Sequence, residues 1–128
     1  MNYVTDTHTI VWYFIDDPRL SPNARQAFEQ TITAGVIIIL TIVLAEIMYI
    51  SQRGRISMTF EETLSHIEMY ENFRIAALEL DILKVAASIR GDLEMHDKLI
   101  VATALYFDAH LITRDKQITQ SGVVDTVW

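Results

Sequence analysis

An unbroken apolar run in the first half of the chain constrains the fold more than any other feature. Residues 36–41 read Val-Ile-Ile-Ile-Leu-Thr, and all but the leucine are β-branched. A strand with one exposed face alternates apolar and polar side chains, whereas a strand covered on both faces is apolar throughout. The run therefore predicts a strand at the centre of a sheet with helices on both faces.

Strand-like and helix-like segments alternate along the rest of the chain. The expected strands cover residues 2–5, 36–41, 73–76, 110–113 and 123–128, the last of them at a sheet edge. The expected helices cover residues 8–14, 22–31, a segment around Glu46 that ends at Arg53, a segment that begins after Thr59, and residues 78–90 and 97–107. This alternation predicts an α/β fold, a three-layer α/β/α sandwich with a central parallel sheet.

Capping residues support several of these helix boundaries. Ser21 followed by Pro22 is typical of an N-cap and the first helical position. Thr59 with Glu62 three residues later forms a capping box. Gly54 stands where the helix around Glu46 should end, a common position for glycine.

The length and composition predict one domain over residues 1–128. The chain has no cysteine, which excludes disulfides and thiolate metal sites and fits a reducing compartment. The longest apolar stretch is too short and too interrupted to span a bilayer, and no basic segment precedes the first strand. We therefore expect a cytoplasmic protein without a membrane partner.

The formal net charge of −7 argues against binding to nucleic acid, because contacts to phosphate require Lys and Arg. The argument weakens if some of the negative charges bind divalent cations, since such ions reverse the local field.

Four acidic residues occupy positions where apolar elements end or pack. Asp6 and Asp115 follow expected strands, Asp97 opens an expected helix, and Glu46 lies within an apolar helix. In a parallel α/β sheet, ligands bind beyond the carboxyl ends of the strands, and the helix start at Asp97 faces the same edge. Carboxylates are seldom buried unless they are paired or bind a cation. The set therefore predicts an all-oxygen site for Mg²⁺ or Mn²⁺.

Each of these residues also has an ordinary structural explanation. Asp6 could cap a helix, Glu46 could face solvent, Asp97 could interact with a helix dipole, and Asp115 could lie in a charged turn. The occurrence of all four in this order favours the functional interpretation.

Several short motifs, taken in order, resemble the PIN domains of bacteria. They are Asp6–Trp12, Leu44–Ile47, Gly54–Ile56, His96–Ala104, Leu111–Asp115 and Val127–Trp128. Together they extend over the whole chain, whose length is similar to that of the VapC-type toxins of this family. The resemblance implies a magnesium-dependent endoribonuclease that acts on RNA, pairs with a cognate antitoxin protein and forms a homodimer.

The resemblance also implies roles for individual residues. Asp6, Asp97 and Asp115 would bind the metal directly or through water. Glu46 would orient or deprotonate the attacking water or bind a second ion, and Thr113 would place a hydroxyl near the site. These residue types suit phosphodiester hydrolysis, because carboxylates are the hard oxygen ligands that Mg²⁺ prefers.

Three basic residues adjoin the expected ligands. Lys98, Arg114 and Lys116 are candidate contacts to RNA phosphates, although solvated surface charges are the ordinary alternative. Trp12 is expected to pack in the core or in a dimer interface.

Three other functions compete with this interpretation. A haloacid-dehalogenase-like phosphatase would need a second Asp two residues after the first, where His8 stands. A receiver domain would need an acceptor Asp after the middle strand, and no Asp lies between Asp17 and Asp81. A catalytically silent PIN-fold module that acts as a co-regulator with a partner protein remains open, because all four acids are present. Metal-dependent RNA cleavage would separate the nuclease from the binding module.

Overall fold

Five parallel strands form one sheet in the computed structural model, which describes residues 1–128. The strand order is β3-β2-β1-β4-β5. The strands are β1 (Tyr3–Thr5), β2 (Ile37–Leu40), β3 (Phe73–Ala76), β4 (His110–Ile112) and β5 (Thr126–Val127). Val4 of β1 pairs with Ile38 on one side and Leu111 on the other, so β1 lies at the centre of the sheet.

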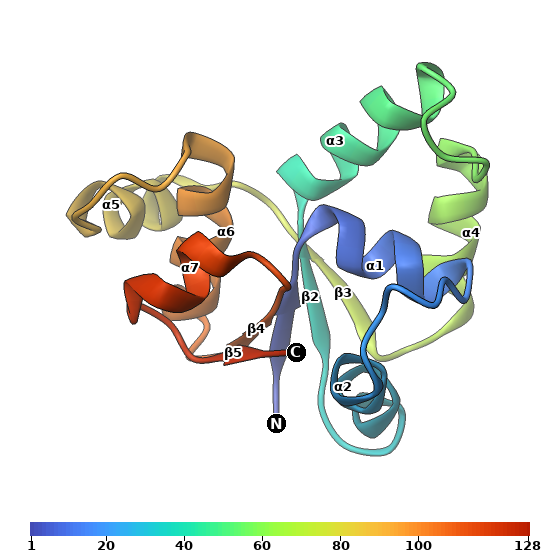
Figure 1. Cartoon of the computed structure of the whole chain (residues 1–128), viewed down its shortest axis with the longest axis horizontal. Helices are drawn as coiled ribbons and strands as arrows, with labels where there is room; N and C mark the ends of the chain where they lie inside the picture. The colour runs from blue at the N-terminus through green and yellow to red at the C-terminus, as the bar shows by residue number, and fades with distance from the viewer.

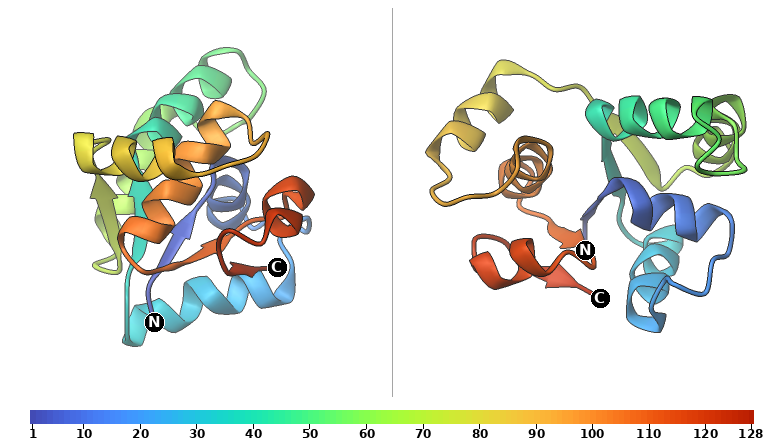
Figure 2. Two further views of the ribbon diagram at one scale, coloured as in Figure 1. Left: turned by 90° about the vertical axis from the view of Figure 1, so that its left-hand side faces the viewer. Right: turned by 45° about the horizontal axis from the view of Figure 1, so that its top comes forward.

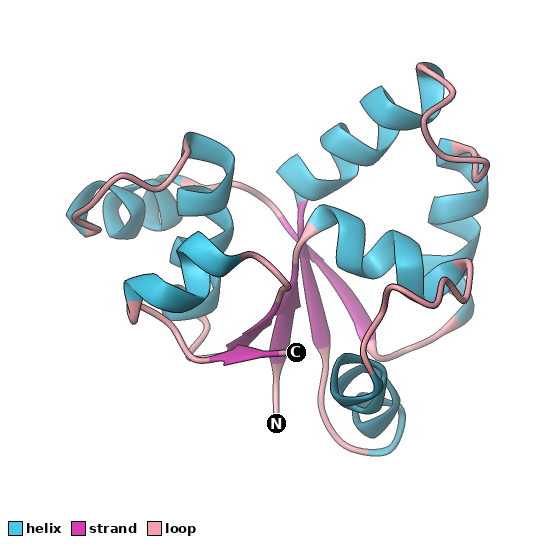
Figure 3. Ribbon diagram, in the orientation of Figure 1, coloured by secondary structure: helices cyan, strands magenta, loops and turns pink.

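Seven helices cover the two faces of this sheet, and the expected three-layer α/β/α sandwich is confirmed (Figures 1 and 3). They are α1 (Thr7–Phe14), α2 (Pro22–Thr33), α3 (Thr41–Gln52), α4 (Phe60–Met69), α5 (Leu80–Ser88), α6 (Met95–Tyr106) and α7 (Lys116–Ser121). The first four lie on one side and the last three on the other, an arrangement that the rotated views of Figure 2 repeat. None of the helices combines the length and the apolar character that crossing a membrane requires.

The apolar run forms β2, as expected, and all four residues of this strand are buried. β2 lies between β1 and β3, with helices on both faces, which explains the absence of polar alternation. The strand is shorter than predicted, because Thr41 already begins α3.

The bounds of two predicted helices were wrong, and one further helix was not predicted. α6 begins at Met95, two residues before Asp97, because the Glu94 carboxylate accepts hydrogen bonds from the backbone N–H groups of His96 (3.0 Å) and Asp97 (3.4 Å). α5 is shorter than residues 78–90. Helix α7 was not predicted, since its six residues bury only Ile118 and carry no apolar period.

The pairing of β1 with β4 fixes the geometry of the sheet's carboxyl edge. Thr5 lies opposite Ile112, so the residues that follow them, Asp6 and Thr113, leave the sheet side by side. Both strands are buried at this point.

Candidate functional site

Asp6 and Thr113 form the fixed centre of the acidic edge. Asp6 is the N-cap of α1, and its Oδ1 accepts a hydrogen bond from the Thr9 backbone N–H at 3.0 Å. The buried Thr113 hydroxyl donates a short hydrogen bond to Oδ2 of Asp6 and accepts one from the Asp115 N–H at 3.1 Å. Both carboxylate oxygens of Asp6 are therefore held in place. Asp6 caps a helix, as the structural alternative predicted, and it also lies at the candidate site.

Asp115 is held in the same way on the neighbouring loop. It is the N-cap of α7, and its Oδ1 accepts a hydrogen bond from the Ile118 N–H at 3.0 Å. Its second oxygen takes part in no hydrogen bond with the protein. The β4–α7 connection thus directs one free carboxylate oxygen toward the edge that carries Asp6.

Asp97 contrasts with these two residues, because its carboxylate accepts no hydrogen bond. It lies partly buried in the first turn of α6. Burial raises the pKa of Asp97 to about 6, with further contributions from the negative charges of Asp115, Glu94, Asp6 and Glu46. The other three predicted carboxylates therefore lie close enough to Asp97 to act on it electrostatically. Glu94 is a fifth acidic residue that the sequence did not single out, since it resembles an ordinary surface charge.

Glu46 reaches the edge from the middle of α3, and its Oε1 is buried without a hydrogen-bond partner. The solvent-facing alternative for this residue is therefore wrong. Burial raises the pKa of Glu46, while the nearby His96 lowers it. The nearby Thr7 hydroxyl also lowers the pKa of Glu46. Neither Thr7 Oγ1 nor Glu46 Oε1 makes a hydrogen bond in the structure.

The four site carboxylates suit a hard divalent cation as ligands. Asp6 and Asp115 accept hydrogen bonds from the protein, whereas Asp97 and Glu46 have no protein partner that satisfies their charge. A buried, unpaired oxygen such as Glu46 Oε1 costs free energy unless a ligand or water compensates it. As the side chains stand, no group of three His, Asp or Glu residues converges closely enough to hold one ion. Metal binding would therefore require the carboxylate side chains to move closer together.

The three predicted phosphate-contacting residues have different surroundings. Arg114 lines a recess of about 400 Å³ that also contains Asp6 and Asp115. Lys98 is partly buried on α6 and Lys116 is exposed at the start of α7, and neither lines this recess. The other lining residues are His8, Thr9, Trp12 and Arg19. Arg19 was missed because it lies in the loop after α1, distant in sequence from every acidic motif.

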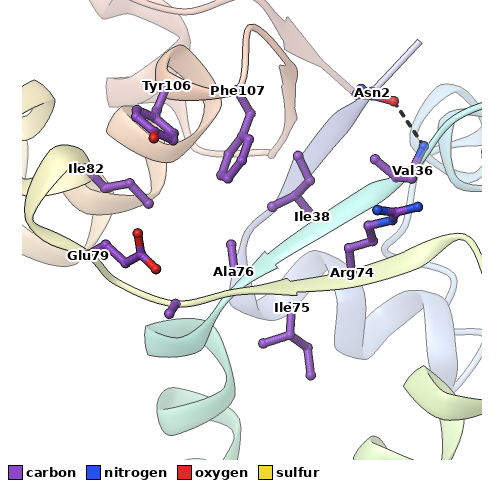
Figure 4. Close-up of a pocket in the computed structure, with 11 residues that line it drawn as sticks. Asn2, Val36, Ile38, Arg74, Ile75, Ala76, Glu79, Ile82, Tyr106 and Phe107 are labelled. Atoms are coloured by element: carbon purple, nitrogen blue, oxygen red, sulfur yellow. Dashed lines mark hydrogen bonds between the residues drawn. The ribbon is translucent and has the colours of Figure 1, made fainter.

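A larger cavity, of about 650 Å³, is a different feature (Figure 4). It lies along β2 and β3 beside α5 and the end of α6, and eight of its eleven lining residues are hydrophobic. None of the four site carboxylates lines it. We assign the chemistry to the smaller acidic edge, because there several carboxylates surround Asp97 and raise its pKa.

The Thr113 hydroxyl provides a direct test of the site's construction. Thr113→Val keeps the side-chain shape but removes a donor to Asp6 and an acceptor for the Asp115 N–H. We expect the free energy of unfolding, measured in urea, to fall by about 1–2 kcal/mol. Thr113→Ser retains the hydroxyl and should keep most of the stability. A valine variant as stable as the original chain would show that these hydrogen bonds do not hold the edge together.

Comparison with known proteins extends this description. A family model described as the PIN domain matches residues 3–122. No curated protein sequence matches the chain. Among solved structures, VapBC2 from Rickettsia felis, bound to a DNA fragment from its promoter, is 19% identical, with a TM-score of 0.74 and coverage of 98% of this chain and 97% of that chain.

Two further structures show the same likeness. DNA-bound VapBC from Salmonella typhimurium is 16% identical, with a TM-score of 0.72 and coverage of 98% of this chain and 96% of that chain. VapC20 from Mycobacterium tuberculosis, described as a sarcin-ricin loop cleaving toxin, is 15% identical, with a TM-score of 0.69 and coverage of 96% and 97%. At these identities the structures share the fold with this chain.

Proposed function

This chain belongs to the PIN domain family, and on that premise we propose that it is a Mg²⁺- or Mn²⁺-dependent endoribonuclease, the toxin of a toxin–antitoxin pair. The observation that carries the proposal is the gathering of four carboxylates at the carboxyl edge of the sheet, where Asp97 has a pKa of about 6. The proteins with a similar fold include VapBC complexes and a sarcin-ricin loop cleaving toxin.

The cation would be held by Asp6, Asp97, Asp115 and Glu46. When bound, a divalent ion supplies Lewis acidity and lowers the pKa of a coordinated water. The protein contributes preorganisation: hydrogen bonds from the Thr9 N–H, the Ile118 N–H and the Thr113 hydroxyl restrict the rotation of Asp6 and Asp115. Residues that orient ligands in this way support both metal affinity and activity.

We propose a second role for Glu46, in addition to its part in the cation site. Its Oε1 has no hydrogen-bond partner, and burial raises its pKa, so it is a better proton acceptor than an exposed glutamate. In the proposed reaction Glu46 orients the attacking water or accepts a proton from it at Oε1.

We also propose that the chain binds a cognate antitoxin and forms a homodimer in the cytoplasm. Exposed apolar side chains line the cavity of Figure 4, among them Ile75, Tyr106 and Phe107. Apolar groups that cluster on one face favour protein–protein contact. The mass in solution, measured by sedimentation equilibrium, tests the dimer. A monomer over the whole micromolar range would contradict it.

The test of the activity is cleavage of RNA by the purified chain with Mg²⁺, with Mn²⁺ and with EDTA. We expect cleavage with either metal and none with EDTA. An Asp97→Asn protein purified in parallel controls for contaminating ribonuclease. Equal cleavage in EDTA, or no cleavage of any RNA with metal present, would refute the proposal.

One observation favours the alternative of a catalytically silent PIN-fold module that regulates through a partner protein. The carboxylates do not converge on a common point in the structure. The cleavage assay decides between the two, because the silent module would leave RNA intact in every metal and still bind its partner.

A further inference from the structure

We propose that Arg19 and Arg114, both placed over the ring of Trp12, bind phosphate groups of the RNA strand beside the acidic edge. This inference rests on the proposed ribonuclease function and identifies where its substrate is held. It adds Arg19 and Trp12 to the site and assigns no phosphate contact to Lys98 or Lys116.

The two arginines share one aromatic platform. The guanidinium carbon of Arg114 lies 4.6 Å from the Trp12 ring centroid, and that of Arg19 lies 4.8 Å from it. Trp12 itself is buried, and its ring meets Trp128 edge-on at a centroid distance of 6.1 Å. A fixed indole ring holds both cations by cation–π attraction and limits their motion.

The two guanidinium groups differ in whether an anion of the protein neutralises their charge. Arg19 forms a forked pair with Asp17, with Nε at 3.0 Å from Oδ1 and Nη2 at 2.8 Å from Oδ2. That pair fixes its orientation and leaves Nη1 free to donate. Arg114 is exposed and makes no hydrogen bond or ion pair, although Asp6 and Asp115 line the same recess. An arginine held in place without an anion is available to an anion from outside.

The chemistry of the recess selects phosphate. Planar guanidinium groups match the oxygens of phosphate with two parallel hydrogen bonds. The recess, at about 400 Å³, is within the size range of ligand pockets and is continuous with Asp6 and Asp115. A phosphate held there belongs to the same strand that reaches the carboxylates. A chain with a net charge of −7 needs such local cations, and these two are the only ones among its ten Lys and Arg residues that line the recess.

The ordinary explanation is that both arginines merely cover the core tryptophan. That explanation predicts a lower stability when either is removed, with no change in RNA affinity or in its salt dependence. The two accounts therefore differ in a binding measurement, and the exposure of both side chains means that their replacement should leave the protein folded.

The experiment measures the affinity for a fluorescent single-stranded oligoribonucleotide in the Asp97→Asn background, with Mg²⁺ present and the salt concentration varied. We expect Arg114→Gln and Arg19→Gln each to weaken binding by about tenfold. The slope of log affinity against log salt should become shallower by about 0.7 for each lost phosphate contact. Arg114→Lys keeps the charge but not the planar fork, so its loss should be smaller.

Lys84→Gln is the matched control, because it removes the same charge from an exposed position on α5 that does not line the recess. It should leave the affinity nearly unchanged. If the arginine variants behave like the Lys84 variant while the unaltered chain still cleaves RNA, the recess is not a phosphate site and the proposed function stands. If the unaltered chain neither binds nor cleaves RNA, both proposals fail.

Discussion

Asp97→Asn should reduce RNA cleavage by roughly a hundredfold or more while leaving the fold intact, the scale on which loss of one preorganised electrostatic group acts. The substitution keeps the shape of the side chain and removes its charge. Asp97 is partly buried and has no hydrogen bond to lose, so its carboxylate has no structural role that the amide would disturb. Asp6→Asn and Asp115→Asn should lower the rate to a similar extent.

Glu94→Gln is a stringent control for this result. Glu94 is exposed, lies close enough to raise the pKa of Asp97, and caps α6 through an oxygen that glutamine also carries. Removing its charge should change the cleavage rate by severalfold at most. Rates would be measured with Mg²⁺ after circular dichroism has shown that each variant is folded. Full activity in two of the three Asp variants would show that the carboxylates are not the reactive site.

The sequence predicted the elements that have a strong local signal. The apolar run became the buried strand β2, and Ser21 and Thr59 cap their helices through side-chain oxygens, as expected. Helix α7 escaped prediction because a single buried residue, Ile118, produces no periodicity. The start of α6 was placed too late because Glu94 resembles a surface charge until its hydrogen bonds to the backbone are seen.

The residues of the site differ in the same way: some have a local signal in the sequence and others do not. The carboxylates could be found from the sequence, because each follows or interrupts an apolar element. The hydrogen bond from Thr113 to Asp6 depends on the register of two three-residue strands, which no local pattern encodes. The contact of Arg19 and Arg114 with one tryptophan joins residues far apart in the chain, so it required the structure.

In metal-free buffer, the free energy of unfolding should fall as the pH rises from about 4 to about 6. The pKa of Asp97 is raised from 3.8 to about 6 in the folded chain. Below pH 3.8 the carboxyl group of Asp97 is neutral in both the folded and the unfolded chain. It then does not repel the neighbouring carboxylates in the folded chain. Between the two values only the unfolded chain releases the proton, so stability is lost until the folded group also ionises. Because Asp97 is partly exposed, solvent screening reduces the loss to about 1 kcal/mol.

Mg²⁺ should restore the stability that is lost through ionisation of Asp97 and should increase it further. A cation that binds only the folded chain stabilises it by about 2.7 kcal/mol at one hundred times the dissociation constant. At neutral pH the melting temperature should therefore rise with Mg²⁺ concentration. Asp97→Asn should melt a few degrees higher than the unaltered chain in EDTA, because one repelling charge is gone, and should respond less to Mg²⁺. Asp92→Asn, at an exposed loop position, should behave like the unaltered chain in both buffers. If the unaltered chain melts at the same temperature with Mg²⁺ and with EDTA, the four carboxylates do not share a metal site.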